Sequence, residues 1–188
     1  MPDYSTGSYF TYGEITLKNL FSVEGKVAIV TGGSRGIGEM IAAGYLANGA
    51  KVYISSRKAA VCDATAARLS KTYGGECISL PADMSNLAGI EGFTAAFKER
   101  ENHLDILVNN AGVAWGAPLE EFPEVGWDKV MDTNVKGVFF LTQKLLPLLE
   151  KNAHTETPSH VVNIGSVDGI KTPVFDNFSY GPSKAAVH

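Results

Sequence analysis

Short runs of apolar, mostly β-branched residues alternate along the chain with longer segments whose apolar positions recur at helical spacing. The short apolar runs are typical of buried strands. The helical spacing of apolar positions in the longer segments is typical of helices that pack one face against a core. Turns rich in glycine or polar residues separate most of these segments. The predicted strands lie at 26–30, 51–55, 77–80, 104–108 and 160–164, and the predicted helices at 37–46, 59–69, within 89–100 and within 127–149.

The predicted strands are apolar along nearly their whole length, so both of their faces must be covered. Each intervening helix then serves as a crossover, and right-handed crossovers place helices on the faces of a parallel sheet. We therefore predict an α/β protein with a doubly wound parallel sheet. In such folds the ligand lies at the carboxyl ends of the strands, where the winding direction reverses.

The composition fits one globular domain that is large enough to bury a core, because 45% of the 188 residues are hydrophobic and 19% are charged. A net charge of −4 argues against a surface that binds nucleic acid, and no apolar run is long enough to span a membrane. We expect the domain at 21–188. An N-terminal extension at 1–20, which lacks the pattern of a secretory signal, is expected to precede it.

Cysteine and histidine usage predicts no metal site and no disulfide framework. The two cysteines, Cys62 and Cys77, match no metal or redox motif, and their low number suits a reducing, cytoplasmic compartment. The histidines are scattered without the spacing of metal ligands. They are His103, His154, His160 and His188.

A glycine-rich segment between the first predicted strand and helix has the context of a dinucleotide-binding loop. Glycines let the backbone approach a pyrophosphate closely, and the start of the helix offers free N–H donors with a favourable dipole. The alternative is a tight turn that binds no ligand. The candidate cofactor-binding residues are Thr31, Gly32, Ser34, Arg35, Gly36, Ile37 and Gly38.

The end of the second predicted strand indicates which dinucleotide is bound. NAD-specific folds place an acidic residue there to bind the adenosine ribose hydroxyls, but this strand continues into Ser56 and Arg57. Arg57 and Arg35 together provide two guanidinium groups for a ribose phosphate, so we predict NADP(H) as the cofactor. The alternative is that both arginines are ordinary solvated surface residues.

Near the end of the chain, Tyr180 precedes Lys184 by four positions. On a helix, this spacing places both side chains on one face, where the ammonium can stabilise a developing phenolate. The pair is therefore a candidate proton donor with its activating charge. A half-buried ring beside a solvated amine is the alternative explanation of the same spacing.

These motifs and four others between them give the chain a resemblance to the short-chain dehydrogenase/reductase family, over 23–188. Within that family it looks most like ketoreductases of the 3-oxoacyl-carrier-protein reductase type, including those of rhamnolipid synthesis. The four further matches are Asp83 in Ala-Asp-Met, the block Asn-Asn-Ala-Gly at 109–112, Asn134 in Asp-Thr-Asn-Val, and Ser166 in Asn-Ile-Gly-Ser.

The resemblance implies a Rossmann fold with strand order 3-2-1-4-5 and assigns roles at the cofactor site. Asp83 would bind the adenine amino group with the Met84 backbone beside it, although an aspartate there could instead cap the next helix. Asn110, Ala111 and Gly112 would border the cofactor within a largely structural block.

The resemblance also implies a catalytic tetrad of Asn134, Ser166, Tyr180 and Lys184. NADPH would reduce a ketone to a secondary alcohol, with Tyr180 as proton donor and Ser166 as a hydrogen-bond donor to the carbonyl oxygen. Lys184 would hold the nicotinamide ribose, and the backbone of Asn134 would hold a water linked to that lysine. Taken alone, Ser166 reads as an ordinary strand-end serine and Asn134 as a surface helix residue.

Family members normally continue beyond the Tyr/Lys helix, so the resemblance implies a C-terminally truncated chain that lacks the last strands. We then expect the fifth strand to form an exposed apolar edge. Relatives form homodimers or homotetramers. The substrate, a small ketone or a 3-oxoacyl compound, is left open, and Phe175 and Phe178 are expected either on a pocket wall or in the core. The alternative function is a noncatalytic dinucleotide-binding remnant that senses cofactor or binds a partner.

Overall fold

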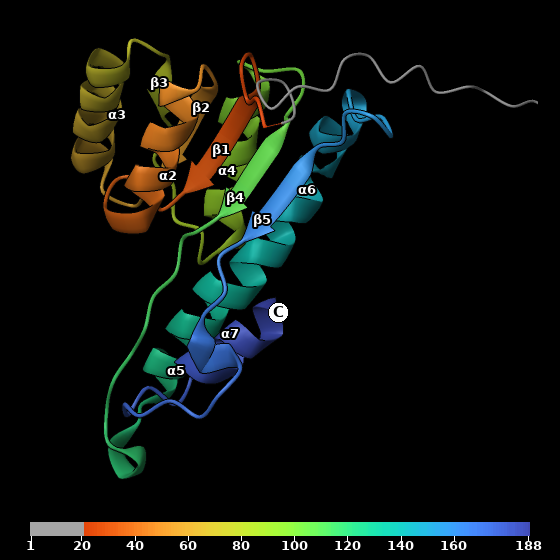
Figure 1. Ribbon diagram of the computed structural model, residues 1–188. Helices are drawn as coiled ribbons and strands as arrows, with labels where there is room; N and C mark the ends of the chain where they lie inside the picture. The colour runs from red at the N-terminus through yellow and green to blue at the C-terminus, as the bar shows by residue number, and fades with distance from the viewer. Residues whose placement is uncertain (1–20) are drawn as a thin grey trace, which may run out of the picture.

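The computed structural model describes residues 21–188, and the extension expected at 1–20 lies outside this described part. The strands are β1 (Val27–Thr31), β2 (Lys51–Ser55), β3 (Cys77–Ser79), β4 (Ile106–Asn109) and β5 (His160–Asn163). Each strand is parallel to its neighbours in one sheet of order β3-β2-β1-β4-β5 (Figure 1). This arrangement confirms the predicted fold class and strand order.

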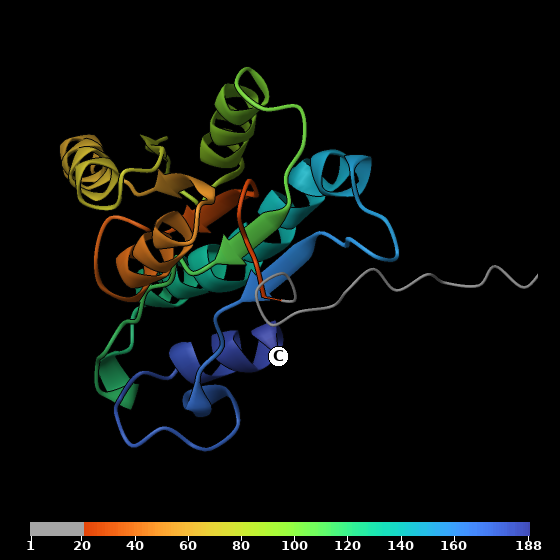
Figure 2. The ribbon, with the colours of Figure 1, turned by 45° about the horizontal axis from the view of Figure 1, so that its top comes forward.

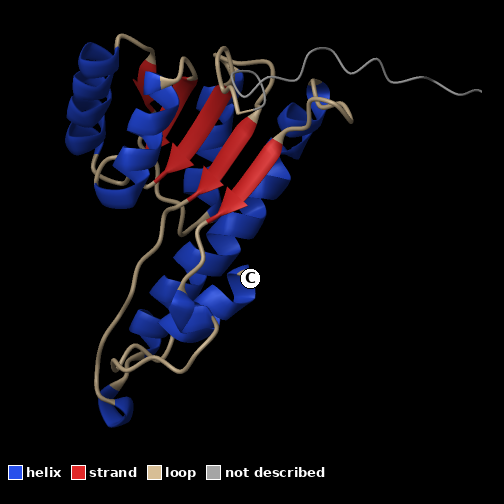
Figure 3. Cartoon of the chain, in the orientation of Figure 1, coloured by secondary structure: helices blue, strands red, loops and turns tan. Residues whose placement is uncertain are grey.

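Helices connect successive strands and follow the last one (Figure 3). The crossovers of the first half are α2 (Gly36–Ala47), α3 (Ala59–Tyr73) and α4 (Leu87–Lys98). The second half contains η1 (Leu119–Glu121), α5 (Glu124–Met131), η2 (Asp132–Lys136), α6 (Gly137–Lys151), η3 (Val167–Gly169) and α7 (Tyr180–Val187).

Two hydrophobic cores lie on opposite faces of the sheet. Helices α2 and α3 cover one face, and α4 and α6 cover the other (Figure 2). Alternate residues of β1 serve the two cores, with Ile29 on the α4–α6 side and Val30 on the α2–α3 side. On the α4–α6 side the ring of Tyr53 meets that of Phe97 edge-on, with their centroids 4.8 Å apart. Burying side chains of this size contributes about 1.5–3 kcal/mol each, which holds the central strands rigidly in place.

The strand predicted at 104–108 begins two residues later, as β4. The Leu104 N–H donates to the carbonyl of Leu148 in α6 instead of to a neighbouring strand. The side chain of Asp105 then accepts hydrogen bonds from the backbone of Val27 and from Lys26 Nζ, at 2.8 and 3.1 Å. These local contacts position the entry to β4 before regular pairing begins.

Capping explains where two helices differ from the prediction. Helix α4 starts at Leu87 because the Asn86 side chain accepts the N–H of Gly89, 2.8 Å away, and satisfies the first turn. Helix α3 extends to Tyr73, beyond the predicted end, and stops at Gly74, whose φ of +70° is readily accessible to glycine.

The helix predicted within 127–149 is a longer helical path interrupted by a π-helical segment. Helices α5 and α6 are joined by η2, so the backbone runs helically from Glu124 to Lys151 but with wider turns at its centre. Gly137 directly follows η2, and a side chain there would overlap the carbonyl oxygen of Met84. Short π-helical insertions occur frequently at functional sites.

Strand β5 forms one edge of the sheet, and all four of its residues are exposed. Val161 and Val162 expose 43% and 40% of their surface, on opposite faces of the strand. A groove with a volume of about 490 Å³ runs between Val161 of β5 and Leu146 of α6. The structure thus confirms the expected exposed apolar edge.

Candidate active site

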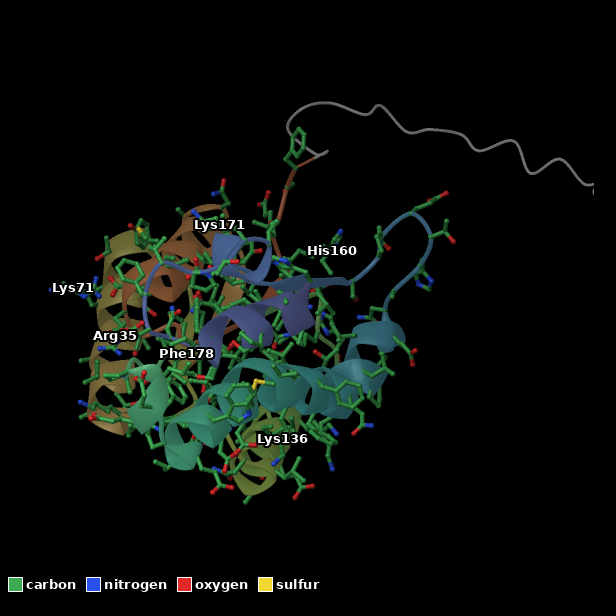
Figure 4. The ribbon with its side chains drawn as sticks, turned by 90° about the horizontal axis from the view of Figure 1, so that it is seen from below. Arg35, Lys71, Lys136, His160, Lys171 and Phe178 are labelled. Atoms are coloured by element: carbon green, nitrogen blue, oxygen red, sulfur yellow. The ribbon has the colours of Figure 1, made fainter. Side chains whose placement is uncertain are left out.

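The predicted site residues gather at the carboxyl ends of the strands. The strands in Figure 1 point toward α5 and α7, and Figure 4 views the molecule from that side, with α7 in front of the sheet. Arg35, in the loop after β1, and Phe178, in the segment before α7, are both visible from there. The sequence predicted the ligand at this end of the sheet.

The loop between β1 and α2 is packed so closely that most of its glycines are required. A Cβ on Gly33 would lie 2.7 Å from Ile54 Cγ2 and 2.9 Å from the Val30 carbonyl. A Cβ on Gly38 would overlap both the Asn110 side chain and the carbonyl of Gly32. The loop therefore lies tightly against β2 and the segment after β4.

The first turn of α2 is open toward the outside. Gly36 has a φ of +57°, and a Cβ placed on it would meet nothing within 4 Å. Arg35 occupies the N-cap position with extended backbone and makes no side-chain capping hydrogen bond. The N–H groups of the first turn, including that of Ile37, are left free by helix geometry, which is the arrangement that binds an anion at a helix start.

Thr31 braces this loop against the segment after β4. Its Oγ1 accepts the N–H groups of Asn110 and Ala111, at 3.0 and 2.9 Å, and donates to the Val108 carbonyl at 3.3 Å. The Asn110 amide donates to the Thr31 carbonyl at 2.8 Å. The Thr31 hydroxyl and carbonyl are thus both occupied within the protein, and the part predicted for Thr31 in cofactor binding stays a prediction.

The loop and the end of β2 lie next to each other, because the Gly33 N–H donates to the Ser55 carbonyl, 3.1 Å away. The segment that carries Ser34 and Arg35 therefore lies beside the segment that carries Ser56 and Arg57. Ser34 is buried, and both arginine side chains are exposed. Within residues 21–188 neither arginine is paired with a carboxylate.

Asp83 does not cap α4, since Asn86 does so. Instead, Asp83 Oδ1 accepts the N–H of Ser85 at 3.0 Å, which holds the carboxylate at the end of the connection from β3. The side chain of the following Met84 is buried in the α4–α6 core. The capping alternative is therefore wrong, and the adenine role stays a prediction.

Asn134 lies in the π-helical segment η2 and is 1% exposed, so it is not a surface residue. Its Oδ1 accepts the Val113 N–H at 2.8 Å, and its Nδ2 donates to the Val113 carbonyl and to Ser183 Oγ, each at 2.9 Å. A Cβ on Gly112 would lie 3.4 Å from Asn134 Oδ1 and 3.7 Å from Lys184 Nζ. Three predicted site residues therefore meet at one point.

The Lys184 side chain is buried beside the Tyr180 ring. Lys184 is 6% exposed, and its Nζ lies 5.7 Å from the ring centroid of Tyr180 and donates to the Ile164 carbonyl at 2.6 Å. Burial lowers the pKa of this ammonium from its ordinary value of 10.5, because the charged form loses water. The alternative of a half-buried ring beside a solvated amine is thus wrong.

Ser166 begins the short helix η3, which packs against α7. Its Oγ accepts the Asp168 N–H at 3.2 Å, so the hydroxyl proton remains available for a substrate oxygen. A Cβ on Gly169 would lie 2.6 Å from the Lys184 carbonyl carbon, which shows how closely η3 approaches α7. The segment from Ser166 through η3 therefore lies directly beside the Tyr180 helix.

Two segments that face each other extend the site outward. The Ala117 N–H donates to the Asp176 carbonyl at 3.0 Å, and the rings of Phe122 and Phe178 stack edge-on with centroids 5.6 Å apart. Phe175 is 73% exposed. Neither Phe175 nor Phe178 belongs to a core, so that alternative is wrong.

The sequence did not predict three groups that hydrogen-bond to the site residues. They are the Ser183 side chain, the Val113 backbone and the Ile164 carbonyl. Only Ser183 carried a signal, since serine and asparagine are poor residues for a helix interior unless their side chains find partners. The Val113 backbone and the Ile164 carbonyl carry no such signal, because their hydrogen-bonding groups do not depend on the residue type.

Two further findings concern residues 21–188. Within this range no helix is both long and apolar enough to cross a membrane. No group of three or more His, Cys, Asp or Glu side chains in the same range is arranged to hold a metal ion.

Comparison with known proteins identifies the family. Residues 26–188 match the sequence profile described as short chain dehydrogenase. The chain belongs to the short chain dehydrogenase family. This membership confirms the resemblance that the motifs indicated.

Several members of the short chain dehydrogenase family are close in sequence and structure. The rhamnolipids biosynthesis 3-oxoacyl-(acyl-carrier-protein) reductase of Pseudomonas aeruginosa is 53% identical over 168 residues, which are 89% of this chain and 65% of that protein. A solved Pseudomonas aeruginosa RhlG/NADP active-site complex is 54% identical with a TM-score of 0.86, over 89% of this chain and 65% of that one. This chain thus spans less than two thirds of the length of these relatives.

A third relative is more distant. A metagenomic short-chain oxidoreductase solved in complex with NADP is 34% identical with a TM-score of 0.78, over 87% of this chain and 72% of that one. The same sheet and helical layers are therefore kept at lower identity.

The close packing of Gly38 yields a prediction about stability. We expect Gly38→Ala to lower the free energy of unfolding by about 2 kcal/mol, because the added methyl forces the start of α2 away from Asn110 and Gly32. Gly44→Ala in the same helix is the control and should raise it by about 0.5–1 kcal/mol, since a Cβ there meets nothing. Urea unfolding measures the change in the free energy of unfolding of each variant. The same change in both variants would contradict the packing argument.

The buried ammonium of Lys184 yields a prediction about pH. Its lowered pKa means that the folded protein binds fewer protons than the unfolded chain just below pH 10.5, so stability gains from this group as pH rises. The free energy of unfolding of the parent minus that of Lys184→Met should therefore increase between pH 7 and 10. Denaturant unfolding at several pH values measures the difference, with Lys71→Met at an exposed lysine as the control. A difference for Lys184→Met that stays flat with pH would rule out this burial effect.

Proposed function

We propose that this chain carries the cofactor-binding and catalytic part of an oxidoreductase that uses NADPH to reduce a ketone to a secondary alcohol. The observation that carries the proposal is the buried Lys184 ammonium beside the Tyr180 ring, at the carboxyl ends of the strands. Burying a charge costs free energy unless the charge is well paired, and groups with a pKa shifted by such burial are concentrated at functional sites. The Tyr180–Lys184 pair has the chemistry of a proton donor with an adjacent positive charge.

The residues present fit a dinucleotide. The uncapped first turn of α2 and the glycines at its start provide backbone N–H donors for a pyrophosphate. Asp83 would bind the adenine amino group beside the Met84 backbone. The remaining residues of the site would border the nicotinamide half; they are Asn110, Ala111, Gly112, Tyr180 and Lys184.

NADP(H), rather than NAD(H), suits the positive charge at the end of β2. Arg35 and Arg57 are exposed and lie on neighbouring segments, where a ribose phosphate would accept hydrogen bonds from both guanidinium groups. Two relatives were solved with NADP, which agrees with this choice.

In the proposed reaction, NADPH, once bound, would supply a hydride for the carbonyl carbon of the ketone. Tyr180 gives its phenolic proton to the carbonyl oxygen, so that the ketone gains one hydride and one proton. Ser166 donates a hydrogen bond to the same oxygen and positions it. Lys184 stabilises the phenolate that remains and holds the nicotinamide ribose, while Asn134 keeps the Lys184 region in place.

The substrate is a ketone, either a small carbonyl compound or a 3-oxoacyl compound. The segment after Ser166 exposes apolar side chains, among them Ile170 and Val174, which are 79% and 83% exposed. The Pseudomonas aeruginosa relative is named as a reductase of 3-oxoacyl groups. Both observations favour a substrate with an apolar part.

The proposal is tested by NADPH binding and by ketone-dependent NADPH oxidation, followed at 340 nm. The assay would offer a simple methyl ketone, a keto sugar and a short 3-oxoacyl thioester. Turnover of at least one supports the reductase. Binding of NADPH without turnover of any ketone would instead support the noncatalytic dinucleotide-binding protein.

Tyr180→Phe separates catalysis from binding. Removing the phenolic proton donor should reduce turnover by about 10³-fold, because general acid catalysis contributes roughly 10²–10⁴-fold and the unactivated hydroxyl of Ser166 is a much weaker acid. The ring remains, so NADPH affinity should change less than about threefold, well under one charge-assisted hydrogen bond. Steady-state kinetics and fluorescence titration with NADPH measure the two effects. Full activity in Tyr180→Phe would refute the assignment.

Arg57→Ala tests the choice of cofactor. Loss of one charge-assisted contact to the ribose phosphate should weaken NADPH binding roughly tenfold and leave NADH binding unchanged. Arg100→Ala, at an exposed arginine after α4, is the matched control. A parent protein that prefers NADH would contradict the role of both Arg35 and Arg57.

A further inference from the structure

Ser183, which lies between Tyr180 and Lys184 in the sequence, is completely buried, and its hydroxyl both donates and accepts a hydrogen bond. It is 0% exposed on α7, one turn after Tyr180 and directly before Lys184. Its Oγ donates to the carbonyl of Tyr180 at 2.7 Å. A serine hydroxyl has a single proton, so toward its other partner Ser183 acts as an acceptor.

That other partner is Asn134, whose Nδ2 lies 2.9 Å from Ser183 Oγ. The second N–H of the same amide donates to the Val113 carbonyl, and its Oδ1 accepts the Val113 N–H. Both donors and the acceptor of the amide are therefore occupied, and its orientation is fixed by the bonds that it makes. The chain of bonds has one direction, from Val113 through Asn134 and Ser183 to Tyr180.

This chain of bonds connects three separate segments: the loop after β4, the π-helical segment η2 and helix α7. A second bond holds the same helix, from Lys184 Nζ to the Ile164 carbonyl after β5. Ser183 and Lys184 are neighbours in sequence, so their side chains leave the helix about 100° apart. Two attachments at that angle fix the rotation of α7 about its own axis.

We infer that Ser183 is a positioning residue, which sets the rotation of α7 through Asn134 and so places the Tyr180 hydroxyl and the Lys184 ammonium. A rotation of about 10° moves an atom about 6 Å from the helix axis by roughly 1 Å. A displacement of that size at reacting groups can lower the rate about 10²-fold. The inference rests on the proposed function for its effect on turnover, but not for its effect on Lys184.

The test compares Ser183→Ala with Ser179→Ala. Both serines are 0% exposed, and Ser179 directly precedes α7, but the Ser179 hydroxyl makes no hydrogen bond to any other described residue. Ser183→Ala leaves one N–H of Asn134 unpaired in a buried place, whereas Ser179→Ala removes no bond. If a variant is merely less stable, the molecules that remain folded still have the parent's structure. Both readouts are therefore taken under conditions where the variants are folded.

In an active protein, Ser183→Ala should lower kcat by about 10- to 100-fold and change the KM for NADPH and ketone by less than about threefold. Independently of turnover, the pKa of Lys184 should rise toward its ordinary value of 10.5, because a rotated α7 gives the ammonium more water. NMR titration of lysine labelled at the ε-carbon, assigned with Lys184→Met, measures this. Ser179→Ala should match the parent in both readouts.

Each outcome decides the inference. If folded Ser183→Ala keeps the parent's Lys184 titration, the inference is overturned, whatever happens to turnover. If the parent is active and Ser183→Ala keeps its kcat, the inference is likewise overturned. If the parent has no turnover, the proposed function fails while the Lys184 titration still decides the role of Ser183. Should Ser183→Ala not fold, Ser183→Cys, which keeps a weak donor, must shift both readouts in the same direction by a smaller amount.

Discussion

Hydrogen bonds between Thr31 and the segment after β4 determine where the other parts of the candidate site lie. Strands β1 and β4 are neighbours, but the chain leaves them in different directions, toward α2 and toward the loop before α5. Such a divergence is where ligands bind in doubly wound sheets. Because Thr31 holds Asn110 and Ala111, the divergence starts at a fixed point, and the glycine loop and Gly112 are both placed relative to it.

The same region shows how the protein keeps buried polar groups satisfied while leaving others available. The Asn134 amide uses both of its N–H donors and its oxygen in hydrogen bonds, which suits a residue that is 1% exposed. Lys184 has three N–H donors, and one of them reaches the Ile164 carbonyl. Burying an ammonium is unfavourable for folding, whereas a positive charge beside Tyr180 suits the proposed chemistry. The position of Lys184 thus lowers the stability of the fold while it suits the function of the site.

The strand order was implied by the family resemblance, whereas the sequence pattern itself predicted the parallel sheet and the end at which the site lies, because apolar strands and glycine turns depend on local pattern. It placed Lys184 and Tyr180 together for the same reason, since four positions on a helix determine a shared face. Other features depend on contacts between distant segments. The π-helical turn around Asn134 and the bond from Asn134 to Ser183 lie among contacts with Met84 and Val113, distant segments that no periodicity reveals. The Asn86 cap was overlooked although asparagine at that position is a recognisable signal.

The exposed edge of β5 divides the site into two parts that are held with different strength. Strands β1 and β4 are buried on both faces, whereas every residue of β5 is exposed, and the carbonyl that holds Lys184 directly follows β5. Segments with few buried contacts open at lower free energy than core strands. A fluctuation that begins at β5 therefore releases Lys184 from Ile164 while the contacts of Thr31 stay closed. Amide hydrogens of the glycine loop and of the segment after β5 would then exchange with solvent on separate timescales, as two independent units within one small sheet.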